Sequence, residues 1–351
     1  MKRIIIADIK SRNNNGHSTG HYFSLAQNYS KLFNNICNVK IAGGPIYKTR
    51  FQEEDIFQLP NDEIAGGNPY INKWKVLRNC YTLFRKTSPN DIIILQHSGI
   101  ITALLGIFLF ASNKQNIYII QYNTEAISSF KGRLIYHLMK DKLTGILCPC
   151  DEVGKAYEIP YCVVTDYIYT EELSTTEITY NQKQYDFCIV GSIWPDKGVV
   201  EVAQALSKTN HSLLIAGKPC NEEIKNILIS ITKNCPNIEL RLEHIPDEDY
   251  YDYIQKSKYC ILNYQGCYNN RSSGVILDIL FNQVPVIARR CNATKFIEEE
   301  TSGFLYNTIE DFDPNLVLNE ITYNKYKNGI KNFLRKQEIY KQKVISFIHL
   351  K

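Results

Sequence analysis

Short runs of consecutive apolar residues, most of them β-branched, constrain the fold of this chain more than any other feature. Residues 3–7 read RIIIA and residues 91–96 read DIIILQ, and such runs alternate with segments of helical period along the sequence. A strand that is apolar on both faces has to be covered on both faces, which is typical of parallel sheets with helices on each side. We therefore expect an α/β protein.

The alternation of strands and helices is interrupted once. Residues 170–184 are rich in Thr, Glu and Gln and poor in apolar side chains, which indicates a connection between domains. The length of 351 residues also favours about two domains. We expect an N-terminal, acceptor-side Rossmann-like domain over 1–168, a linker over 169–184, a C-terminal, donor-binding Rossmann-like domain over 185–318, and C-terminal helices over 319–351 that pack back towards the N-terminal domain.

The periodicity also predicts individual elements. Helices are expected at 22–32, 73–86, 100–111, 131–141, 152–157, 199–208, 222–234, 247–256 and after 274. Strands are expected at 3–7, 39–42, 91–96, 117–122, 145–148, 161–165, 185–190, 212–216, 238–242, 259–263 and 286–288. No element is placed between residues 48 and 69.

Composition bounds the class of protein. Hydrophobic residues make up 44% and charged residues 22% of the chain, a globular balance, and the net charge of +4 is too small for a nucleic-acid-binding surface. Eleven cysteines without framework spacing indicate reduced thiols in a cytoplasmic protein. The apolar run at 100–111 is shorter than the about 20 residues that cross a bilayer. We interpret it as a buried helix, with a peripheral contact at the inner face of the membrane as the alternative.

The stretch from Asn269 to Ala288, NNRSSGVILDILFNQVPVIA, predicts a polar turn, a helix and a buried strand. A helix N-terminus presents unpaired N–H groups and about half a unit of positive charge, which attract phosphate. Ser272, Ser273 and Gly274 would therefore bind a phosphate with Arg271 beside them. Asp278, one turn further, would bind hydroxyl groups of the same ligand. An ordinary capped helix packed on a sheet is the alternative.

Three further loops follow predicted strands at the same edge of the sheet. Gly191 ends the first strand of the C-terminal half, and Lys197 stands at the start of the next helix, within reach of a phosphate. Lys218 follows the second strand and is either directed at the ligand or solvated. His244 follows the third strand, in a loop that could cover a flat base. Because ligands of open α/β sheets bind beyond the carboxyl ends of the strands, the four loops together predict a nucleotide site.

With these loops, the C-terminal half resembles the retaining glycosyltransferases of group 4, which have the two-Rossmann GT-B fold. The resemblance is carried by YDFCIVGSIWPDKG (185–198), LLIAGKP (213–219), YIQKSKYCILNYQ (253–265), RSSGVILDILFNQVPVIARRC (271–291) and ETSGFLY (300–306). Before residue 185 it covers only the architecture, with the loop at 13–20, which contains Gly16, similar to the family's first-strand loop. It implies two Rossmann-like doubly wound domains that face a cleft.

The resemblance also implies roles for single residues. Asp278 matches the family's ribose-binding carboxylate, and Lys197 matches its phosphate-binding lysine. Asn270 stands where the family has another carboxylate, and an amide can bond a sugar hydroxyl but carries no charge. Ser192 stands where the family has an arginine. A histidine that many members have in the N-terminal domain is missing, so His97 is our substitute, with a strand-end residue of no role as the alternative.

The predicted site can now be given as a whole. Arg271, Lys218 and Arg289 are the candidates to replace the missing arginine, although Arg289 also fits a solvated strand end. His97 and Asn270 are the predicted catalytic residues. The predicted donor-binding residues are Gly16, Gly191, Lys197, Lys218, His244, Arg271, Ser272, Ser273, Gly274, Val275 and Asp278.

We expect transfer of a sugar from a nucleotide-diphosphate donor to a glycan or lipid-linked acceptor, in the synthesis of capsule or lipopolysaccharide. The leaving diphosphate would meet Lys197, Arg271 and the helix N-terminus, so neither a metal nor another cofactor is expected. The acidic residues 247–249 are explained as the start of a helix and not as a metal motif. Nucleic acid is not an expected partner.

Two other functions stay open at this point. Asn270, Ser192 and the missing histidine would fit a GT-B-like protein that has lost catalysis and serves as a binding partner in a glycan-assembly complex. A GT-B-fold epimerase that interconverts a nucleotide sugar without an acceptor is the third hypothesis.

Overall fold

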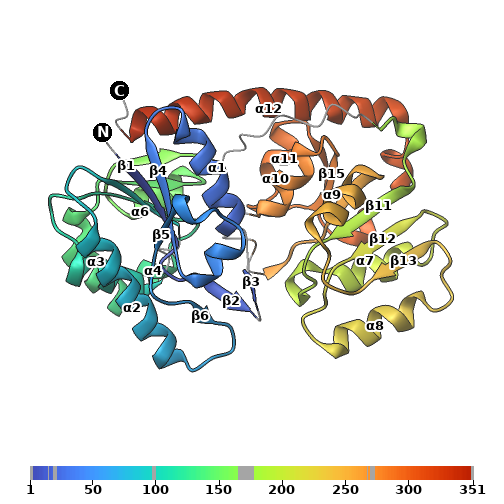
Figure 1. The fold of residues 1–351 in the computed structure, drawn as a ribbon. Coiled ribbons are helices and arrows are strands. Elements are labelled where there is room, and N and C mark those ends of the chain that lie inside the picture. The colour runs from blue at the N-terminus through green and yellow to red at the C-terminus, as the bar shows by residue number, and fades with distance from the viewer. Residues whose placement is uncertain are drawn as a thin grey trace. The chain divides into compact units, whose positions relative to one another are not determined.

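The computed structural model describes residues 3–14, 16–18, 22–96, 100–164, 178–266, 268 and 273–348, the side chains of residues 17, 18 and 247 excepted (Figure 1). The chain divides into two compact units, residues 1–171 with 338–351, and residues 172–337. Each unit is built around one parallel sheet, so the expected α/β fold with two Rossmann-like units is confirmed.

The first unit contains the elements β1 (Arg3–Ala7), β2 (Arg12–Asn14), β3 (His17–Ser18), α1 (Tyr22–Asn34), β4 (Asn38–Gly43), η1 (Pro45–Thr49), η2 (Glu53–Asp55), β5 (Ile56–Gln58), β6 (Glu63–Ile64), α2 (Pro69–Lys86), β7 (Ile92–Leu95), α3 (Ile101–Phe110), β8 (Asn116–Ile120), α4 (Glu125–Ser128), α5 (Phe130–Met139), η3 (Lys140–Lys142), β9 (Gly145–Cys148), α6 (Asp151–Ala156) and β10 (Tyr161–Val163). Seven strands form a parallel sheet in the order β10-β9-β8-β7-β1-β4-β5, and β3-β2-β6 form a small second sheet.

The central strands of the first sheet are buried on both faces, as their apolar runs predict. Ile5 and Ala7 of β1 belong to a core shared with α2, α3 and α5 on one face. Ile4 and Ile6 point to the other face, which α1 covers. All four side chains are 0% exposed, so a single polar substitution here would bury an unpartnered group.

The second unit contains η4 (Tyr180–Gln182), β11 (Tyr185–Val190), η5 (Pro195–Lys197), α7 (Val199–Leu206), β12 (Leu213–Ala216), α8 (Glu222–Thr232), β13 (Ile238–Arg241), α9 (Asp247–Gln255), β14 (Ser257–Leu262), α10 (Gly274–Phe281), β15 (Val286–Arg289), α11 (Lys295–Glu299), β16 (Gly303–Tyr306), η7 (Ile309–Asp311) and η8 (Pro314–Leu316). Its six strands are parallel in the order β13-β12-β11-β14-β15-β16. The helix α12 (Glu320–Phe347) contributes residues to both units.

The structure adds to the elements expected from sequence, notably in the segment 48–69, at the start of α2 and after β15. The segment 48–69 contains the end of η1, then η2, β5 and β6. Helix α2 begins earlier than expected because the side chain of Asn68 caps the N–H groups of Tyr70 and Ile71, with Pro69 as the first helical residue. A sixth strand, β16, follows β15. It begins with Gly303, where a Cβ would lie 1.8 Å from the carbonyl oxygen of Val286, so glycine permits close strand packing here.

The expected domain boundaries stay a prediction, because the expected linker at 169–184 is described only from residue 178 onwards. The C-terminal segment is expected as helices, and its residues Glu320–Phe347 form one long helix. Its last turn packs in the first unit, where the ring of Phe347 meets the ring of Tyr118 edge-on at 5.6 Å. No helix among the described residues has the length and apolar character that a bilayer crossing requires.

An ion pair joins the two central strands of the first sheet at their amino ends. Arg3, the first residue of β1, donates two hydrogen bonds to the carboxylate of Asp91, just before β7, over 3.1 and 2.6 Å. Burial raises the pKa of Asp91, but the bonds from Arg3 and Ser88 outweigh it and hold the pKa below its usual value. The pair therefore fixes β7 against β1.

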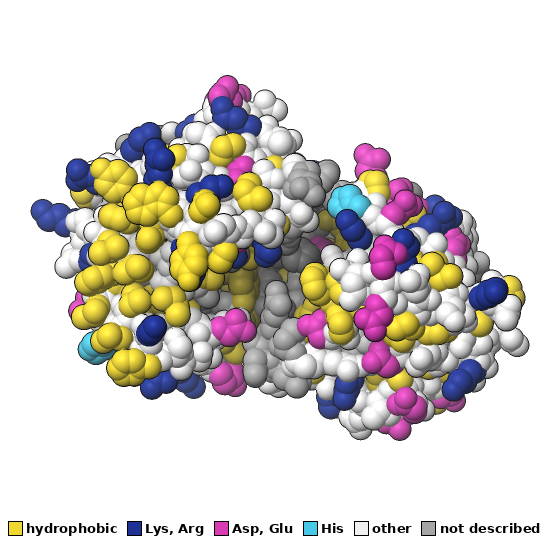
Figure 2. Space-filling model, turned by 90° about the horizontal axis from the view of Figure 1, so that it is seen from below, with side chains coloured by type: hydrophobic (Ala, Val, Ile, Leu, Met, Phe, Trp, Pro, Cys, Tyr) yellow, Lys and Arg dark blue, Asp and Glu magenta, His cyan; other side chains and the backbone are white. Residues whose placement is uncertain are grey.

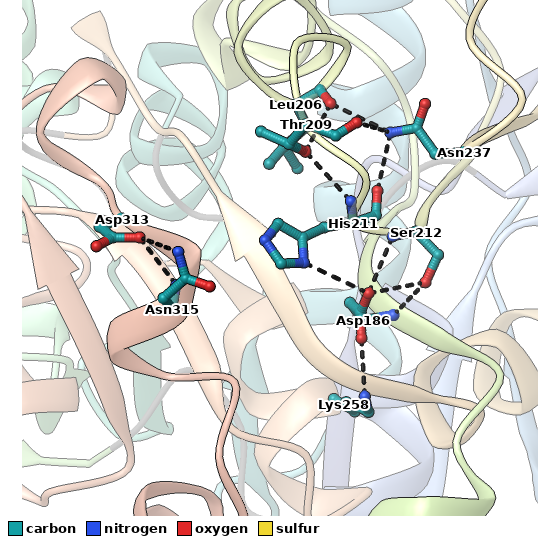
Figure 3. Close-up of polar contacts among 9 residues, drawn as sticks. All are labelled: Asp186, Leu206, Thr209, His211, Ser212, Asn237, Lys258, Asp313 and Asn315. Carbon is teal, nitrogen blue, oxygen red and sulfur yellow. Dashed lines mark hydrogen bonds and ion pairs between the residues drawn. The ribbon is translucent and has the colours of Figure 1, made fainter.

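The second sheet has a corresponding network (Figure 3). Asp186, in β11, accepts a hydrogen bond from Lys258 of β14 over 2.8 Å and two from Ser212, just before β12, over 3.0 and 3.2 Å. Burial raises the pKa of Asp186, and the bonds from Lys258 and Ser212 more than reverse this, so that the pKa is below its usual value. One carboxylate thus holds β11 to both of its neighbours.

We predict that Asp91→Asn lowers the free energy of unfolding by about 2 kcal/mol at neutral pH, because Arg3 loses its charged partner. The folded-state pKa is depressed, so the contribution of the carboxylate is complete above the unfolded pKa of about 3.9 and is lost as the pH falls through the folded pKa. Urea denaturation should therefore show a difference from wild type at neutral pH that shrinks below about pH 4. The exposed Asp141→Asn serves as control. Equal stability of wild type and Asp91→Asn at neutral pH would contradict the assignment.

Candidate functional site

The order of strands reverses once in the second sheet. From β11 the chain continues outward to β12 and β13, and it then crosses to β14 on the other side of β11 and continues to β15 and β16. Because the strands are parallel, their carboxyl ends lie at one edge. Ligands of doubly wound sheets bind at this reversal, here between the ends of β11 and β14.

Gly191 follows β11 at this reversal and, having no side chain, leaves its backbone accessible to a ligand. Its φ of +93° is one that residues with a side chain rarely adopt. A Cβ at Gly191 would lie 3.7 Å from Nζ of Lys197, 3.9 Å from the ring of Tyr250 and 4.0 Å from Cγ2 of Val275. Lys197 of η5, Tyr250 of α9 and Val275 of α10 therefore surround the space that a side chain at position 191 would occupy.

The position of Lys197 is set by the residue after it. Gly198 ends η5 with a left-handed φ of +59°, and a Cβ there would lie 2.4 Å from the side-chain nitrogen of Asn263. That nitrogen donates to the carbonyl oxygen of Gly198 over 3.1 Å, and Oδ1 of Asn263 accepts from the hydroxyl of Tyr306 over 3.1 Å. This buried chain ties the Lys197 turn to the ends of β14 and β16.

The carboxylate of Asp278 lies one helical turn inside α10. It is 5% exposed and accepts a hydrogen bond from the hydroxyl of Tyr250 over 3.2 Å. Burial and the charge of Asp278 raise the pKa of Tyr250 well above its ordinary value, so the phenol keeps its proton at physiological pH. Tyr250 was not a predicted site residue, although it lies in the helix that begins with the acidic residues 247–249.

The start of α10 is held by a second tyrosine. The hydroxyl oxygen of Tyr264 lies 2.7 Å from Oγ of Ser273, and its ring stacks on that of Tyr268 with centroids 3.9 Å apart. The side chain of Ser273 does not cap α10. All eight residues of the helix, from Gly274 to Phe281, are buried, so the predicted helix is covered on every side.

Three other predicted donor residues, Lys218, His244 and Gly16, are described by the structure but are not among the residues nearest to a Cβ at Gly191. Lys218 is exposed, but its carbonyl oxygen accepts from the N–H of Ile193 over 3.0 Å, so its loop adjoins that of Gly191. His244 is exposed at the end of the edge strand β13, two strands from β11. Gly16 lies in the first unit, with a φ of +88°.

Four predicted residues, His97, Asn270, Arg271 and Ser272, lie outside the described residues. Arg289, a candidate to replace the family's arginine, donates to the carbonyl oxygen of Asn307 over 3.2 Å. Among the residues that the structure describes, no three His, Cys, Asp or Glu side chains are grouped as a metal site would require.

The first sheet also reverses its strand order, between β7 and β1. Beyond the carboxyl ends of β7 and β8 lie Gln96 and Gln121, each 1% exposed. Nε2 and Oε1 of Gln96 and Nε2 of Gln121 have no hydrogen-bond partner among the described residues. An unpartnered buried amide costs about 1–3 kcal/mol, and side chains of this kind are commonly satisfied by a ligand or by water. Neither glutamine was predicted, although a polar residue that ends an apolar run was the available signal.

We predict that Gln96→Leu leaves the free energy of unfolding unchanged or raises it by about 1 kcal/mol, because no hydrogen bond is lost. Gln115→Leu is the matched control. Its side chain is also buried, but its amide donates to Phe84 and Thr87 over 3.0 and 2.8 Å and accepts from Ser112 over 2.9 Å. The control should lose about 2–3 kcal/mol in urea denaturation. An equal loss in both variants would show that Gln96 has a partner in the folded protein.

No protein-family model matches the chain, and no curated protein sequence matches it. Solved structures resemble its fold. The E. coli trehalose-6-phosphate protein bound with UDP-2-fluoro glucose has a TM-score of 0.70 at 10% identity, over 99% of this chain and 98% of that chain. AviGT4, a glycosyltransferase involved in avilamycin A biosynthesis, has a TM-score of 0.62 at 11% identity, over 99% and 96%.

A mutant of S. aureus TarM in complex with fondaparinux, alpha-GlcNAc-glycerol and UDP has a TM-score of 0.57 at 13% identity. The alignment covers 78% of this chain and 59% of TarM, so the chain spans less than two thirds of TarM. At these identities the likeness establishes the fold, which is the expected GT-B fold.

Proposed function

We propose that the protein is a glycosyltransferase that takes a sugar from a nucleotide-diphosphate donor. One observation carries the proposal: the ammonium group of Lys197 lies beside the bare face of Gly191, next to Val275 in the first turn of α10. A diphosphate at this point would meet a cation, an open backbone and a helix N-terminus, all of which favour phosphate. Similar structures with bound UDP or UDP-2-fluoro glucose support a nucleoside diphosphate as the ligand.

We assign the ribose of the donor to Asp278. Its carboxylate would accept hydrogen bonds from ribose hydroxyl groups, as the family resemblance implies. The protonated phenol of Tyr250 would orient that carboxylate through the bond of 3.2 Å. The loop of His244 is assigned to the base and Lys218 to the outer phosphate, and both assignments follow from their places along the same sheet edge.

In the proposed reaction the bond between the anomeric carbon and the donor's diphosphate oxygen breaks, and the electron pair leaves with the diphosphate. A bond forms between the anomeric carbon and an acceptor hydroxyl, whose proton is released to the leaving diphosphate. Lys197 and the N-terminus of α10 would stabilise the developing charge, so we propose transfer without a metal. Retention at the anomeric carbon follows from the resemblance, and His97 and Asn270 stay the proposed contacts of the transferred sugar.

We assign the acceptor to the first unit. The unpartnered Nε2 and Oε1 of Gln96 can donate to and accept from a sugar hydroxyl, and the unpartnered Nε2 of Gln121 can donate to one. A glycan or lipid-linked saccharide, as used in capsule or lipopolysaccharide synthesis, carries many such groups. A hydroxyl in contact with Gln96 would supply the hydrogen bonds that the free protein lacks.

We predict that Gly191→Ala weakens binding of a nucleoside diphosphate by at least about ten-fold, because its methyl group enters the space between Lys197 and Val275. Gly66→Ala is the matched control. Gly66 also has a positive φ, of +75°, but a Cβ there meets nothing within 4 Å. Both variants should lose about 1–2 kcal/mol of stability through backbone strain. Calorimetric titration with UDP and GDP should show weaker binding in the Gly191 variant alone, and equal affinities would remove Gly191 from the site.

The activity is tested by incubating the protein with a panel of nucleotide sugars and saccharide acceptors and measuring released nucleoside diphosphate. We expect release with one donor, and a loss of about 100-fold or more in kcat/KM in Lys197→Met, because the leaving group loses its cation. The exposed Lys208→Met should retain activity. Donor binding without release under all conditions would overturn catalysis in favour of a binding partner. Exchange of a sugar proton with solvent in the absence of an acceptor would instead indicate an epimerase.

A further inference from the structure

The outer faces of three neighbouring helices in the first unit carry large apolar side chains. Helices α2, α3 and α5 pack side by side over one face of the first sheet and bury their inner faces in its core. Figure 2 shows hydrophobic side chains gathered over the left-hand part of the surface. The exposed apolar side chains of the three helices are Tyr70, Ile71, Trp74, Tyr81, Ile101, Leu109, Phe130, Leu134 and Leu138, here called the apolar face.

Two stripes of helical spacing make up most of the apolar face. Tyr70, Trp74 and Tyr81 follow one side of α2, and Tyr70 and Trp74 are 78% and 66% exposed. Phe130, Leu134 and Leu138 repeat every four residues along α5, and Phe130 is 82% exposed. A helix that packs only on its own sheet carries polar residues on its outer side, so these stripes indicate a further apolar environment. Tryptophan and tyrosine are typical of the boundary between lipid and water.

Every formally charged side chain of the three helices is a cation. The cations are Lys73, Lys75, Arg78, Arg85 and Lys86 of α2 and Lys131 and Arg133 of α5. Within the part of the chain that the structure describes, none of them forms an ion pair with a carboxylate. Lys73 instead lies over the ring of Tyr70 at 5.7 Å, and Arg85 over that of Tyr81 at 5.9 Å. Positive charge is thus interleaved with the aromatic side chains.

A basic pocket of about 620 Å³ adjoins the apolar face. Arg133, His137 and Lys140 line it, together with the hydroxyl-bearing residues Thr124 and Ser128. Its acidic lining residue, Glu158, lies 3.4 Å from Lys140 and is offset by that charge. Arg133 and His137 directly precede Leu134 and Leu138 in the sequence, so the basic and apolar sides of α5 are adjacent around the helix.

We infer that this face docks on a bilayer that contains anionic lipid. The apolar face would enter the boundary between head groups and acyl chains, and Arg133, the pocket cation that is not paired with Glu158, would bind the phosphate of a head group. The interleaved cations match a negative lipid surface. The same cations argue against a second copy of this chain as the occupant, because two copies joined through this face would bring like charges together. The inference does not depend on the proposed function.

The test is co-sedimentation of the full chain with vesicles. Vesicles of phosphatidylcholine mixed with phosphatidylglycerol should bind the protein about ten-fold or more tightly than vesicles of phosphatidylcholine alone, and added salt should weaken the binding. Absence of binding to the mixed vesicles, or equal binding to both kinds, overturns the inference.

Two pairs of substitutions test the assigned surface. Trp74→Ser with Phe130→Ser removes exposed aromatic rings, and Arg133→Gln with Lys140→Gln removes the pocket's cations. Each pair should reduce binding to the mixed vesicles by about ten-fold or more. Ile227→Ser with Ile229→Ser, on the exposed side of α8, is the matched control and should bind like wild type. If the aromatic pair binds like wild type, the assigned surface is wrong.

Size-exclusion chromatography of wild type and of the same paired variants tests whether a second copy of the chain, and not lipid, occupies the apolar face. A wild-type oligomer that the aromatic pair dissociates, without vesicle binding, would assign the face to a second copy and overturn the lipid inference. Urea denaturation checks that each variant is folded, and titration with UDP and GDP tests the proposed function separately. A protein that binds vesicles but no nucleotide would contradict the proposed function and leave this inference standing. A protein that binds nucleotide but no vesicles would contradict this inference and leave the proposed function standing.

Discussion

An ion pair at the amino end of the two central strands is the interaction on which each half of this protein depends. Arg3 and Asp91 join β1 to β7, and Asp186 and Lys258 join β11 to β14. In both sheets the joined strands are those between which the strand order reverses. A parallel sheet has one register for each pair of strands, so a pair fixed at one edge also fixes which residues meet at the other. The opposite edge can then present open backbone and buried polar groups without losing its alignment.

The two edges differ in how far their polar groups are satisfied. At the amino edge of the second sheet the carboxylate of Asp186 has three bonds to Lys258 and Ser212. At the carboxyl edge of the first sheet the amide of Gln96 has none among the described residues. Buried polar groups without partners lower stability, so a chain that keeps them at one edge has to obtain stability elsewhere. In the first sheet the ion pair at the amino edge supports the fold, and the unpartnered amide of Gln96 at the carboxyl edge is where we propose a ligand.

Much of this organisation follows from the sequence, because burial on both faces of a strand requires continuous apolar runs. The runs beginning at Ile4 and Ile92 identified their strands, and the polar turn before Gly274 identified the start of α10. The contacts of single side chains did not follow. Tyr250 reaches Asp278 only because α9 and α10 come together in space, and no spacing in the sequence encodes that distance. A glycine such as Gly303 suggests the end of a strand, yet Gly303 begins β16. Glycine is required there because the backbone of the neighbouring strand β15 lies too close for a side chain, and the sequence does not show that contact.

The glycines that follow the strands of the second sheet pack so closely against neighbouring atoms that they limit which mutations the protein can accept. A Cβ at Gly217 would lie 1.9 Å from the carbonyl oxygen of Gly191, and one at Gly198 would strike Asn263, so these loops admit almost no substitution. Lys218 and His244, by contrast, are exposed at the same edge. Mutation can therefore change the exposed positions Lys218 and His244 while the glycines stay fixed. In the proposed donor site, a lineage built on this scaffold could therefore change the base that it selects in small steps, and a laboratory library meant to alter that selection is best confined to these exposed positions.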